Sequence, residues 1–420
     1  MAGMTAEKQK LLDQIEADKD MLVGFFSKFV ATRSPNPPGD TRDAVAHITR
    51  FLEANKLPHR LVAPDPLQAN VVGTIEGKGA GKHLVLNGHI DVFPVDESDT
   101  RWTHGAWSGA VADGKVWGRG SCDMKCGTTA SIMTYYYMSK IRDRWKGKLT
   151  LTCVSDEETF GPMGARYLMD NVPEVLGDCL LNGEPSSPYS IRFGEKGPFW
   201  VEFTVRTRGG HGAYTHTSES ASKIAVRFIS ELEALTEIKA NMPDNVGRAL
   251  AAATKEMDRA MGDGAAAIVT KVTLNIGVVA GGLKVNMIPD VVKIQADIRL
   301  PVGVSKEQVV AEIDKIMKRH PQITMKEMNF SAPSWCDPYS EMVEHLQANA
   351  GRLRRDLKPV PIVSLGGTDA RLWRYKKIPA YVYGPPPTGM GSYNEYVEID
   401  DFMHVVRTHV LSAYDYLTRS

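Results

Sequence analysis

Short apolar runs that alternate with helical stretches in the first half of the chain limit the possible folds more than any other feature. Helical periodicity covers residues 127–141 and 163–171 between and after these runs. Strands that alternate with helices are typical of an α/β layered domain with a largely parallel sheet. The runs read ANVVGTI (69–75), HLVLNGHI (83–90), KLTLTCVS (148–155) and CLLNGEP (179–185).

The pattern changes between residues 197 and 331. A strand-like run, an amphipathic helix, two strand-like runs, a second helix and a last strand-like run follow one another there. This order predicts a small α+β (ferredoxin-like) domain with its helices on one face of a sheet. Because 420 residues exceed the usual size of one core, we expect a catalytic domain formed by 1–196 and 332–420, interrupted by an inserted domain at 197–331.

Composition excludes several classes of protein. Fifty basic residues balance fifty acidic ones, so the chain lacks the positive footprint of a protein that binds nucleic acid or a membrane surface. No apolar run approaches the roughly 18 residues that span a membrane, and the charged N-terminus lacks the apolar core of a signal peptide. Five cysteines, an odd number, argue against a disulfide framework. We expect a cytoplasmic protein whose partner is a small-molecule substrate.

Histidine and acidic residues follow the strand-like runs. His89 and Asp91 lie two apart at the end of one run and therefore point to the same side of a strand. Sites in α/β sheets form at the carboxyl ends of strands, so we expect this pair to meet further acidic residues. An imidazole with several carboxylates suits Zn²⁺, Mn²⁺ or a similar cation, which would relieve the repulsion among the carboxylates. The further residues are Asp123 in GRGSCDMKCG, Asp156, Glu157 and Glu158 in VSDEETFG, and Glu184 in LNGEPSS.

Each of these residues, taken alone, also has a structural interpretation. Their placement at successive strand ends favours the metal site. Cys122 and Cys126 form a CxxxC pair without a second pair, which is a weak zinc signal, and we interpret both as packing residues. The structural interpretations of the remaining residues are packing for His89, a solvated surface for Glu157 and Glu158, an ion pair of Asp123 with Lys125, and a loop position for Glu184.

Several motifs together resemble the M20 metallopeptidase family, which includes carboxypeptidase G2, aminoacylase-1, acetylornithine deacetylase and succinyl-diaminopimelate desuccinylase. The motifs run in family order across roughly residues 70–405, nearly the whole chain. The resemblance implies a zinc-peptidase-like catalytic domain and an inserted lid or dimerisation domain, and hence a homo-oligomer that is at least a dimer. The motifs are GHIDVFP, GRGSCDMKCG, SDEETFG, GEP, GGHGAYTH, GGLKVNMIPD, ADIRLP, GGTDAR and NEYVEIDD.

The resemblance also implies roles for residues of the catalytic domain. Asp91 would stand behind His89 and fix the tautomer of its ring, as groups behind metal ligands do. Glu157 would be the general base that takes a proton from the attacking water and returns it to the leaving nitrogen. The implied metal ligands are His89 and Glu184 at a first site, Glu158 at a second site, and Asp123 as a bridge between them.

Substrate contacts follow from the same resemblance. His211 in GGHGAY matches a histidine that the inserted domain sends into the partner subunit's active site. Asn286 and Arg299 match residues that contact substrate, and a guanidinium pairs well with a carboxylate. Thr368 lies in a substrate-contacting loop. Two structural interpretations stay open, namely Arg299 as an ion pair with Asp297 and Asn286 as a turn residue.

The chain departs from the family pattern near its C-terminus. The family's fifth metal ligand is a histidine about four residues before the glutamate of EYV. Here Glu395 is that glutamate, and Gly391 occupies the position of the histidine. A glycine offers no side-chain ligand. We therefore expect one tightly held metal ion or one that is readily lost, and Glu158 could instead join a single shared site.

These observations predict a metal-dependent hydrolase of a C–N bond in a small carboxylate-bearing substrate, of the deacylase, amidase or short-peptide hydrolase type. An aryl-amine hydrolase of the 5-nitroanthranilate aminohydrolase type, which releases ammonia by nucleophilic aromatic substitution, is one alternative. A catalytically inactive binding homologue is another, although the retained base and carboxylates argue against it. The aromatic residues near the motifs, which are compatible with a flat substrate and equally with packing, are Phe93, Trp117, Tyr214 and Tyr393.

Overall fold

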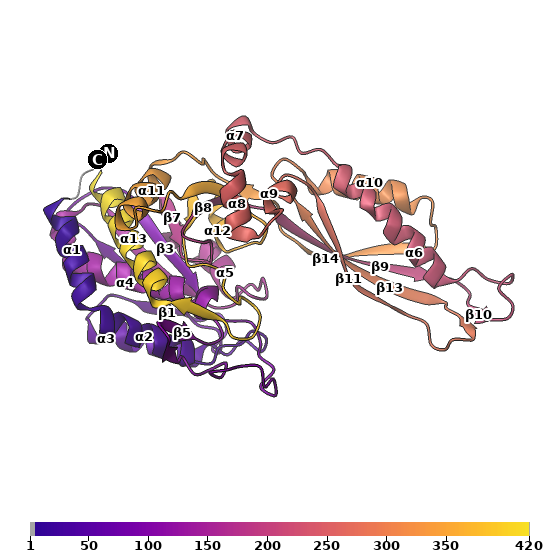
Figure 1. Ribbon diagram of the computed structural model, residues 1–420, viewed down its shortest axis with the longest axis horizontal. Coiled ribbons are helices and arrows are strands. Elements are labelled where there is room, and N and C mark those ends of the chain that lie inside the picture. Colours follow the sequence, from indigo (N-terminus) through magenta and orange to yellow (C-terminus); the bar gives the residue numbers. More distant parts are fainter. Residues whose placement is uncertain (1–4, 420) are drawn as a thin grey trace. The chain divides into compact units, whose positions relative to one another are not determined.

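A computed structural model describes residues 5–419, and the chain divides into two compact units (Figure 1). Unit 1 comprises Met1–Phe193, Cys336–Ile362 and Thr368–Ser420, and unit 2 comprises Gly194–Trp335 and Val363–Gly367. Among the described residues, no helix combines the length and the apolar character needed to cross a bilayer.

A large mixed sheet forms the framework of unit 1, although its last strand, β15, belongs to unit 2. Its strand order is β1-β2-β6-β3-β7-β17-β8-β15, and β16 also pairs with β8. The central strands β6, β3, β7 and β17 run parallel, whereas β1, β2 and β8 are antiparallel to their neighbours. The α/β fold class is thus confirmed, and the parallel part of the sheet lies at its centre. The strands are β1 (Arg60–Val62), β2 (Asn70–Glu76), β3 (His83–His89), β6 (Lys148–Val154), β7 (Cys179–Asn182), β8 (Ser190–Glu195), β15 (Ser334–Trp335), β16 (Val360–Ser364) and β17 (Ala380–Val382).

Helices and a small second sheet complete unit 1 (Figure 1). Helix α13 packs against both α4 and α11, and α4 and α13 contact β3. Helices α5 and α12 share an apolar cluster with strand residues such as Val85 and Leu180. The second sheet has the order β18-β5-β4. The elements are α1 (Ala6–Ala17), α2 (Lys19–Ala31), α3 (Arg42–Ala54), α4 (Cys126–Lys140), α5 (Ala165–Asn171), α11 (Glu341–Leu353), α12 (Ala370–Tyr375), α13 (Ile399–Thr418), β4 (Val111–Ala112), β5 (Lys115–Trp117) and β18 (Tyr396–Glu398).

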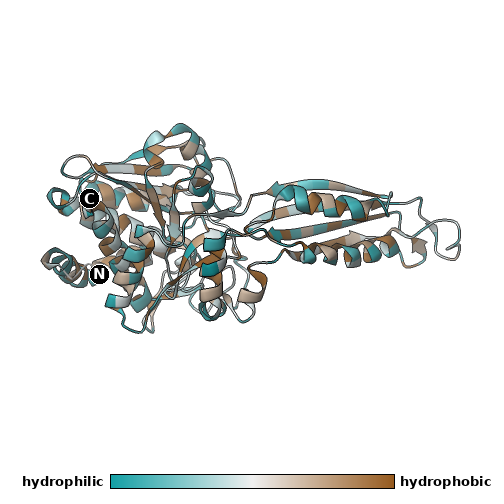
Figure 2. Cartoon of the chain, turned by 90° about the horizontal axis from the view of Figure 1, so that it is seen from above, coloured by the Kyte–Doolittle hydropathy of each residue, from teal (hydrophilic) through white to brown (hydrophobic). Residues whose placement is uncertain are grey.

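Unit 2 has the predicted ferredoxin-like arrangement. Its antiparallel sheet has the order β11-β13-β9-β14, and the chain order β9, α6, β11, β13, α10, β14 is that of a split βαβ fold. Side chains of β9 alternate between buried and partly exposed, because one face of the sheet packs under α6 and α10. Figure 2 shows apolar and polar residues alternating along these elements. They are β9 (Gly197–Arg206), α6 (Ala221–Leu232), β11 (Thr273–Gly281), β13 (Val291–Leu300), α10 (Lys306–Met317) and β14 (Ile323–Phe330), with β10 (Gly210–His211) paired to β12 (Met287–Ile288).

Residues 6–31 form two helices, α1 and α2, because Asp18 leaves helical geometry (φ −88°, ψ 4°) between them. Unit 2 contains three helices that the sequence analysis did not predict. In the first of them the buried residues Val246, Ala249 and Leu250 have helical spacing, so the sequence contained the periodicity that predicts a helix. These helices are α7 (Asp244–Ala252), α8 (Thr254–Met261) and α9 (Ala265–Ile268).

Candidate metal centre

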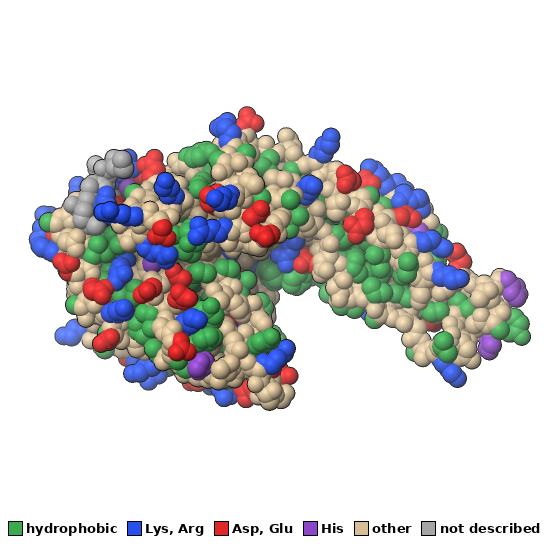
Figure 3. Space-filling view, viewed as in Figure 1, with side chains coloured by type: hydrophobic (Ala, Val, Ile, Leu, Met, Phe, Trp, Pro, Cys, Tyr) green, Lys and Arg blue, Asp and Glu red, His purple; other side chains and the backbone are tan. Residues whose placement is uncertain are grey.

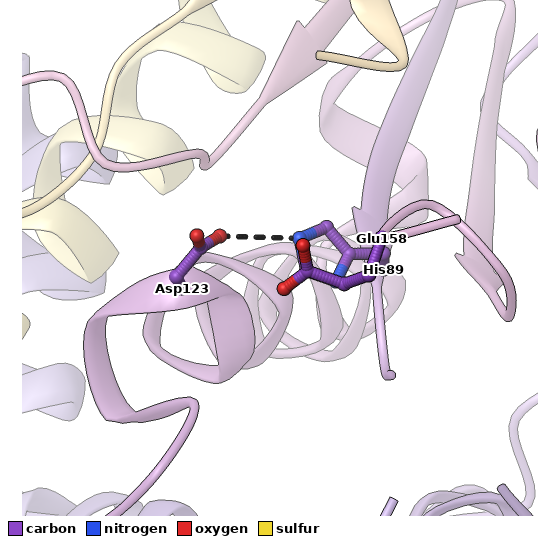
Figure 4. Close-up of side chains that lie close together, drawn as sticks. All are labelled: His89, Asp123 and Glu158. Atoms are coloured by element: carbon purple, nitrogen blue, oxygen red, sulfur yellow. Dashed lines mark hydrogen bonds and ion pairs between the residues drawn. The ribbon is translucent and has the colours of Figure 1, made fainter. Parts of the chain in front are cut away.

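His89 is the last residue of β3 and lies at the centre of the acidic cluster (Figure 4). Its ring is buried, with Nε2 3.2 Å from Asp123 Oδ1 and 3.4 Å from Glu184 Oε1. Its Nδ1 atom lies 2.8 Å from the main-chain oxygen of Asp91 and 3.4 Å from a carboxylate oxygen of the same residue. Asp91 therefore holds the imidazole from one side, and Nε2 faces the carboxylates.

Asp91 also holds the turn that carries two of the glutamates. Its fully buried carboxylate accepts the main-chain N–H groups of Glu157 (3.2 Å) and Glu158 (3.1 Å), and the side-chain amide of Asn36 at 2.9 Å. Burial raises the pKa of Asp91, but the hydrogen bond and the charge of His89 outweigh this effect and hold the pKa below its usual value. One carboxylate thus links the histidine strand to the acidic turn.

Asp123 lies in η1 (Ser121–Lys125), a short π-helical turn, where its φ and ψ angles of −113° and 97° are not helical. Glu395 fixes this turn from the C-terminal part of the chain. Its Oε1 atom accepts the N–H groups of Cys122 (3.0 Å) and Asp123 (3.2 Å), and its Oε2 atom accepts a hydrogen bond from Arg119 at 2.6 Å. The position of Asp123 therefore depends on a buried carboxylate.

Neighbours of Asp123 in the sequence do not join the cluster. Lys125 donates to the main-chain oxygen of Thr32 at 2.7 Å, so the structure does not support an ion pair of Lys125 with Asp123. Cys122 and Cys126 are fully buried, in keeping with their interpretation as packing residues. Burial raises the pKa of both thiols well above the usual value.

The turn after β6 positions Glu157 and Glu158. Asp156 begins it with a φ of 81°, and its carboxylate accepts hydrogen bonds from the hydroxyl of Thr159 (2.6 Å) and the N–H of Met163 (2.9 Å). Such local side-chain bonds stabilise tight turns. Asp156 therefore has a structural role here, and the two glutamates that follow it are held at the carboxyl end of the sheet.

Two sets of side chains could hold a divalent cation. In each set, one potential ligand atom per residue lies within 4.8 Å of the others. Figure 4 shows the first set, with His89 and Glu158 close together and Asp123 facing the ring. The structure thus brings all the predicted acidic residues except Asp156 and Asp91 into possible ligand positions. The sets are His89, Asp123 and Glu158, and His89, Glu157 and Glu184.

Burial and mutual repulsion dominate the electrostatics of the cluster. Burial raises the pKa values of Glu157 and Glu158 well above the usual range, and it raises the pKa of Glu184 to about 7. Burial lowers the pKa of His89, but the nearby charges of Glu184 and Asp123 outweigh it and raise this pKa well above the usual value. The positive charge of His89 is therefore too small to balance the several carboxylates around it.

The donor set fits a divalent cation. Glu158 Oε1 is buried and has no hydrogen-bond partner among residues 5–419, although buried polar atoms are normally paired. An imidazole and carboxylates are the ligands that Zn²⁺ and Mn²⁺ accept. Gly391 adds no ligand. Its φ is 71°, and a Cβ atom there would face the ring of Phe93 at 3.8 Å.

Thr368, a predicted substrate contact, lies in unit 1. It is buried, and its hydroxyl oxygen accepts the N–H of Ala370 at 3.3 Å. This bond lies at the start of α12 and constrains the loop before that helix. The contact of Thr368 with substrate stays a prediction.

The remaining predicted substrate contacts lie in unit 2. His211 and Asn286 are exposed neighbours, because His211 pairs with Met287 and the carbonyl of Asn286 accepts the Gly212 N–H at 2.7 Å. Arg299 lies near the C-terminal end of β13, roughly 25 Å along the strand from Val291, the first residue of that strand. It forms a bidentate pair with Asp297 at 2.8 and 2.9 Å, so the ion-pair interpretation of Arg299 has a structural basis.

Sequence analysis missed several residues that support the centre. The clearest is Arg371, whose Nη1 atom lies 3.4 Å from Glu157 Oε1. It closes the GGTDAR motif that already contains Thr368, and its place in that motif is the signal that could have identified it. Three further residues were missed, namely Arg119 in GRGS, Asn36 in SPNPPGD, and Asp369 in GGTDAR.

Known proteins share this architecture. A family model described as peptidase family M20/M25/M40 matches residues 85–415. A succinyl-diaminopimelate desuccinylase of Cereibacter sphaeroides is 27% identical over 354 residues, which cover 81% of this chain and 85% of the relative.

Solved structures are similar in fold. An M20 family metallo-carboxypeptidase from Sulfolobus solfataricus has a TM-score of 0.78 at 18% identity, over 94% of this chain and 98% of that chain. A dinuclear metal-binding peptidase of the M20 family from Bacillus subtilis has a TM-score of 0.62 at 15% identity, over 96% and 99% of the two chains.

Proposed function

Because the chain belongs to peptidase family M20/M25/M40 and is a metallohydrolase of amide C–N bonds, we propose that it removes an acyl group from, or cleaves a short peptide in, a small substrate that carries a carboxylate. The observation that carries this proposal is the convergence of His89 with buried carboxylates from three separate segments. A bound cation makes such a cluster of like charges favourable without protonation of the carboxylates.

Glu157 is the general base in this proposal. Asp91 fixes its main chain, and an oxygen of its carboxylate lies within 4.8 Å of potential ligand atoms of His89 and Glu184, close enough to face a water beside the cation. It takes a proton from water as the water oxygen bonds to the carbonyl carbon, and it delivers that proton to the nitrogen as the C–N bond breaks. His89, Asp123 and Glu184 would hold a divalent cation, which when bound would supply positive charge to polarise the carbonyl and to lower the pKa of water.

We propose a single cation, Zn²⁺ or Mn²⁺, that is either tightly held or readily lost. Position 391 provides no side-chain ligand, which leaves Asp123 and Glu158 as the candidate ligands for any second ion. The metal content of the purified protein after dialysis tests this part. One equivalent or less per chain, with activity restored by added Mn²⁺ or Zn²⁺, is the expected result, and two retained equivalents would overturn it.

We further propose that residues 197–331 act as a lid and dimerisation domain, that His211 reaches the active site of the partner subunit, and that Asn286 contacts substrate. Both residues are exposed on the β10–β12 pair. Figure 3 shows hydrophobic side chains gathered over the sheet of this unit. Sedimentation of the purified protein should show a dimer. The exposed large apolar residues of β11, of β14 and of the segment from β11 to β12 are Val278, Val279, Leu283, Val285, Met287 and Met328.

Glu157→Gln tests the reaction. Turnover of N-acyl amino acids or dipeptides should fall by about a hundredfold to ten-thousandfold, while metal content and the melting temperature stay close to wild type. Glu76→Gln, on the exposed end of β2, is the matched control and should leave turnover unchanged. Unchanged turnover of Glu157→Gln would contradict the assignment.

The products decide between the reaction types. Amide hydrolysis releases a carboxylic acid and an amine, whereas aryl-amine hydrolysis releases ammonia and a phenol. A panel that includes aminobenzoates should therefore yield free amine from amides and no ammonia from aryl amines. None of the structural findings favours an aryl-amine hydrolase or an inactive binding homologue.

A further inference from the structure

We propose that Arg371 positions the general base, by holding one carboxylate oxygen of Glu157 so that the second oxygen is left to face the reacting water. This inference rests on the proposed function, in which Glu157 is the base. Arg371 is then a positioning residue that acts through Glu157 and touches neither water nor substrate.

The first observation is the contact between the two side chains. Arg371 lies in α12 and is 1% exposed, and its Nη1 atom is 3.4 Å from Glu157 Oε1. The same guanidinium group donates to the main-chain oxygen of Thr368. Because the guanidinium is anchored to the backbone of its own loop, it presents a fixed point to the glutamate rather than a mobile one.

The second observation is a contact with the ring of Phe160. The guanidinium carbon of Arg371 lies 5.2 Å from the centroid of this ring, within the range of a cation–π interaction. Phe160 belongs to the same turn as Glu157, since its N–H donates to the Glu157 carbonyl at 3.0 Å. Arg371 therefore contacts the turn after β6 through two side chains, the carboxylate of Glu157 and the ring of Phe160.

The surroundings of Arg371 explain why the turn needs it. Asp369 is buried close enough to Glu157 for the two negative charges to repel each other, and Arg371 and His89 are nearby positive charges that offset both. Without the arginine, Glu157 would turn away from Asp369. Three rotatable bonds give a glutamate side chain ample freedom to do so.

Positioning of this kind affects the rate more than it affects substrate binding. A general base must lie within hydrogen-bond reach of the proton that it accepts, and a displacement of about 1 Å costs on the order of a hundredfold in rate. Loss of Arg371 should therefore lower kcat and leave KM and metal content nearly unchanged.

The test compares Arg371→Met and Arg371→Lys with Arg374→Lys in metal-loaded, full-length protein. Arg374 is a buried arginine on the same helix, but its Nε atom donates to the Ala380 carbonyl at 3.0 Å rather than to a catalytic carboxylate. We expect kcat to fall about a hundredfold in Arg371→Met and by less in Arg371→Lys. KM should stay within about threefold in both, and Arg374→Lys should keep the wild-type kcat.

Two outcomes would overturn the proposal. One is a wild-type kcat in folded Arg371→Met, or in Arg371→Lys if the Met variant does not fold. The second is a change in KM alone, which would make Arg371 a substrate contact. Crystal structures of the variants with bound Mn²⁺ give a readout that needs no turnover. In these structures Glu157 should move or take several conformations, and an unmoved Glu157 carboxylate would refute the inference. This readout holds even if the wild type hydrolyses none of the panel. That last result would refute the proposed function instead.

Discussion

The two units differ in how many ionisable side chains they bury. The core of unit 2 is an apolar cluster in which residues such as Phe203, Phe228 and Ile313 are inaccessible to solvent, and its buried ionisable side chains are Glu195, Lys196 and His320. Unit 1 buries many more ionisable groups, among them His89 and Glu395. Buried ionisable groups lower the free energy of unfolding unless they are paired or bind a metal. The comparison indicates that the buried charged groups of the candidate site lower the free energy of unfolding of unit 1, whereas the apolar core of unit 2 raises that of unit 2.

The largest effect should come from opening a cavity in the core of unit 2. Phe228 is fully buried on α6 and packs edge to face on Phe203, with ring centroids 4.9 Å apart. Phe228→Ala should lower the free energy of unfolding of unit 2 by about 3–5 kcal/mol. Hydrogen exchange of unit 2 peptides should accelerate, while metal content stays at the wild-type level. A parallel loss of metal would show that the units do not differ in the way proposed.

Acid should act on unit 1 through His409. Burial lowers its pKa to about 4 against the opposing effect of its hydrogen bond to the Tyr383 carbonyl, which lies 2.6 Å away. The pKa is near 6.5 in an unfolded chain. Below pH 6.5 the unfolded state therefore binds more protons, and stability falls as the pH drops toward 4. The loss is at most about 1.4 kcal/mol per pH unit.

His409→Gln should reduce this pH dependence in metal-loaded protein, because glutamine does not titrate. Part of the slope should remain, because burial also lowers the pKa of His47 to about 4 and that of His404 to about 3. Denaturant unfolding followed by exchange of unit 1 peptides at several pH values measures the slope. A variant slope equal to that of the wild type would assign the acid sensitivity to different groups.

Metal affinity should depend on the buried carboxylate that holds the Asp123 turn. Glu395→Gln keeps one acceptor oxygen for the N–H groups of Cys122 and Asp123 but removes the charge that pairs with Arg119. Loss of such a supporting partner typically weakens metal binding by about 10- to 100-fold. Titration of the dialysed protein with Mn²⁺ measures it, with the exposed Glu398→Gln as control. Equal affinities in the two variants would mean that the turn does not need Glu395.

The smallest effect should come from restoring a ligand at position 391. Gly391→His should raise the retained metal toward two equivalents per chain, since a Cβ atom there has open space apart from Phe93. The φ of 71° is unfavourable for a histidine and should cost about 1–2 kcal/mol. Elemental analysis and a thermal melt measure both effects. A variant that is destabilised but gains no metal would show that position 391 does not face a metal position.

The sequence by itself determined the fold class and the core of the site. Strand-like runs reveal β3 and β6 because burial imposes a local pattern, and the two-residue spacing of His89 and Asp91 placed both at one strand end. Glu157, Glu158 and Glu184 could be predicted for the same reason, since the ends of parallel strands share one edge of the sheet.

Only the tertiary structure decided how these groups are held. Arg371 meets Glu157 across 214 residues, and Glu395 meets Asp123 across 272 residues. Local periodicity contains no information on such partners, because they are selected by the packing of distant segments rather than by the alternation of neighbours. For the same reason the sequence showed that position 391 lacks a ligand, whereas the ring of Phe93 facing it became visible only in the folded chain.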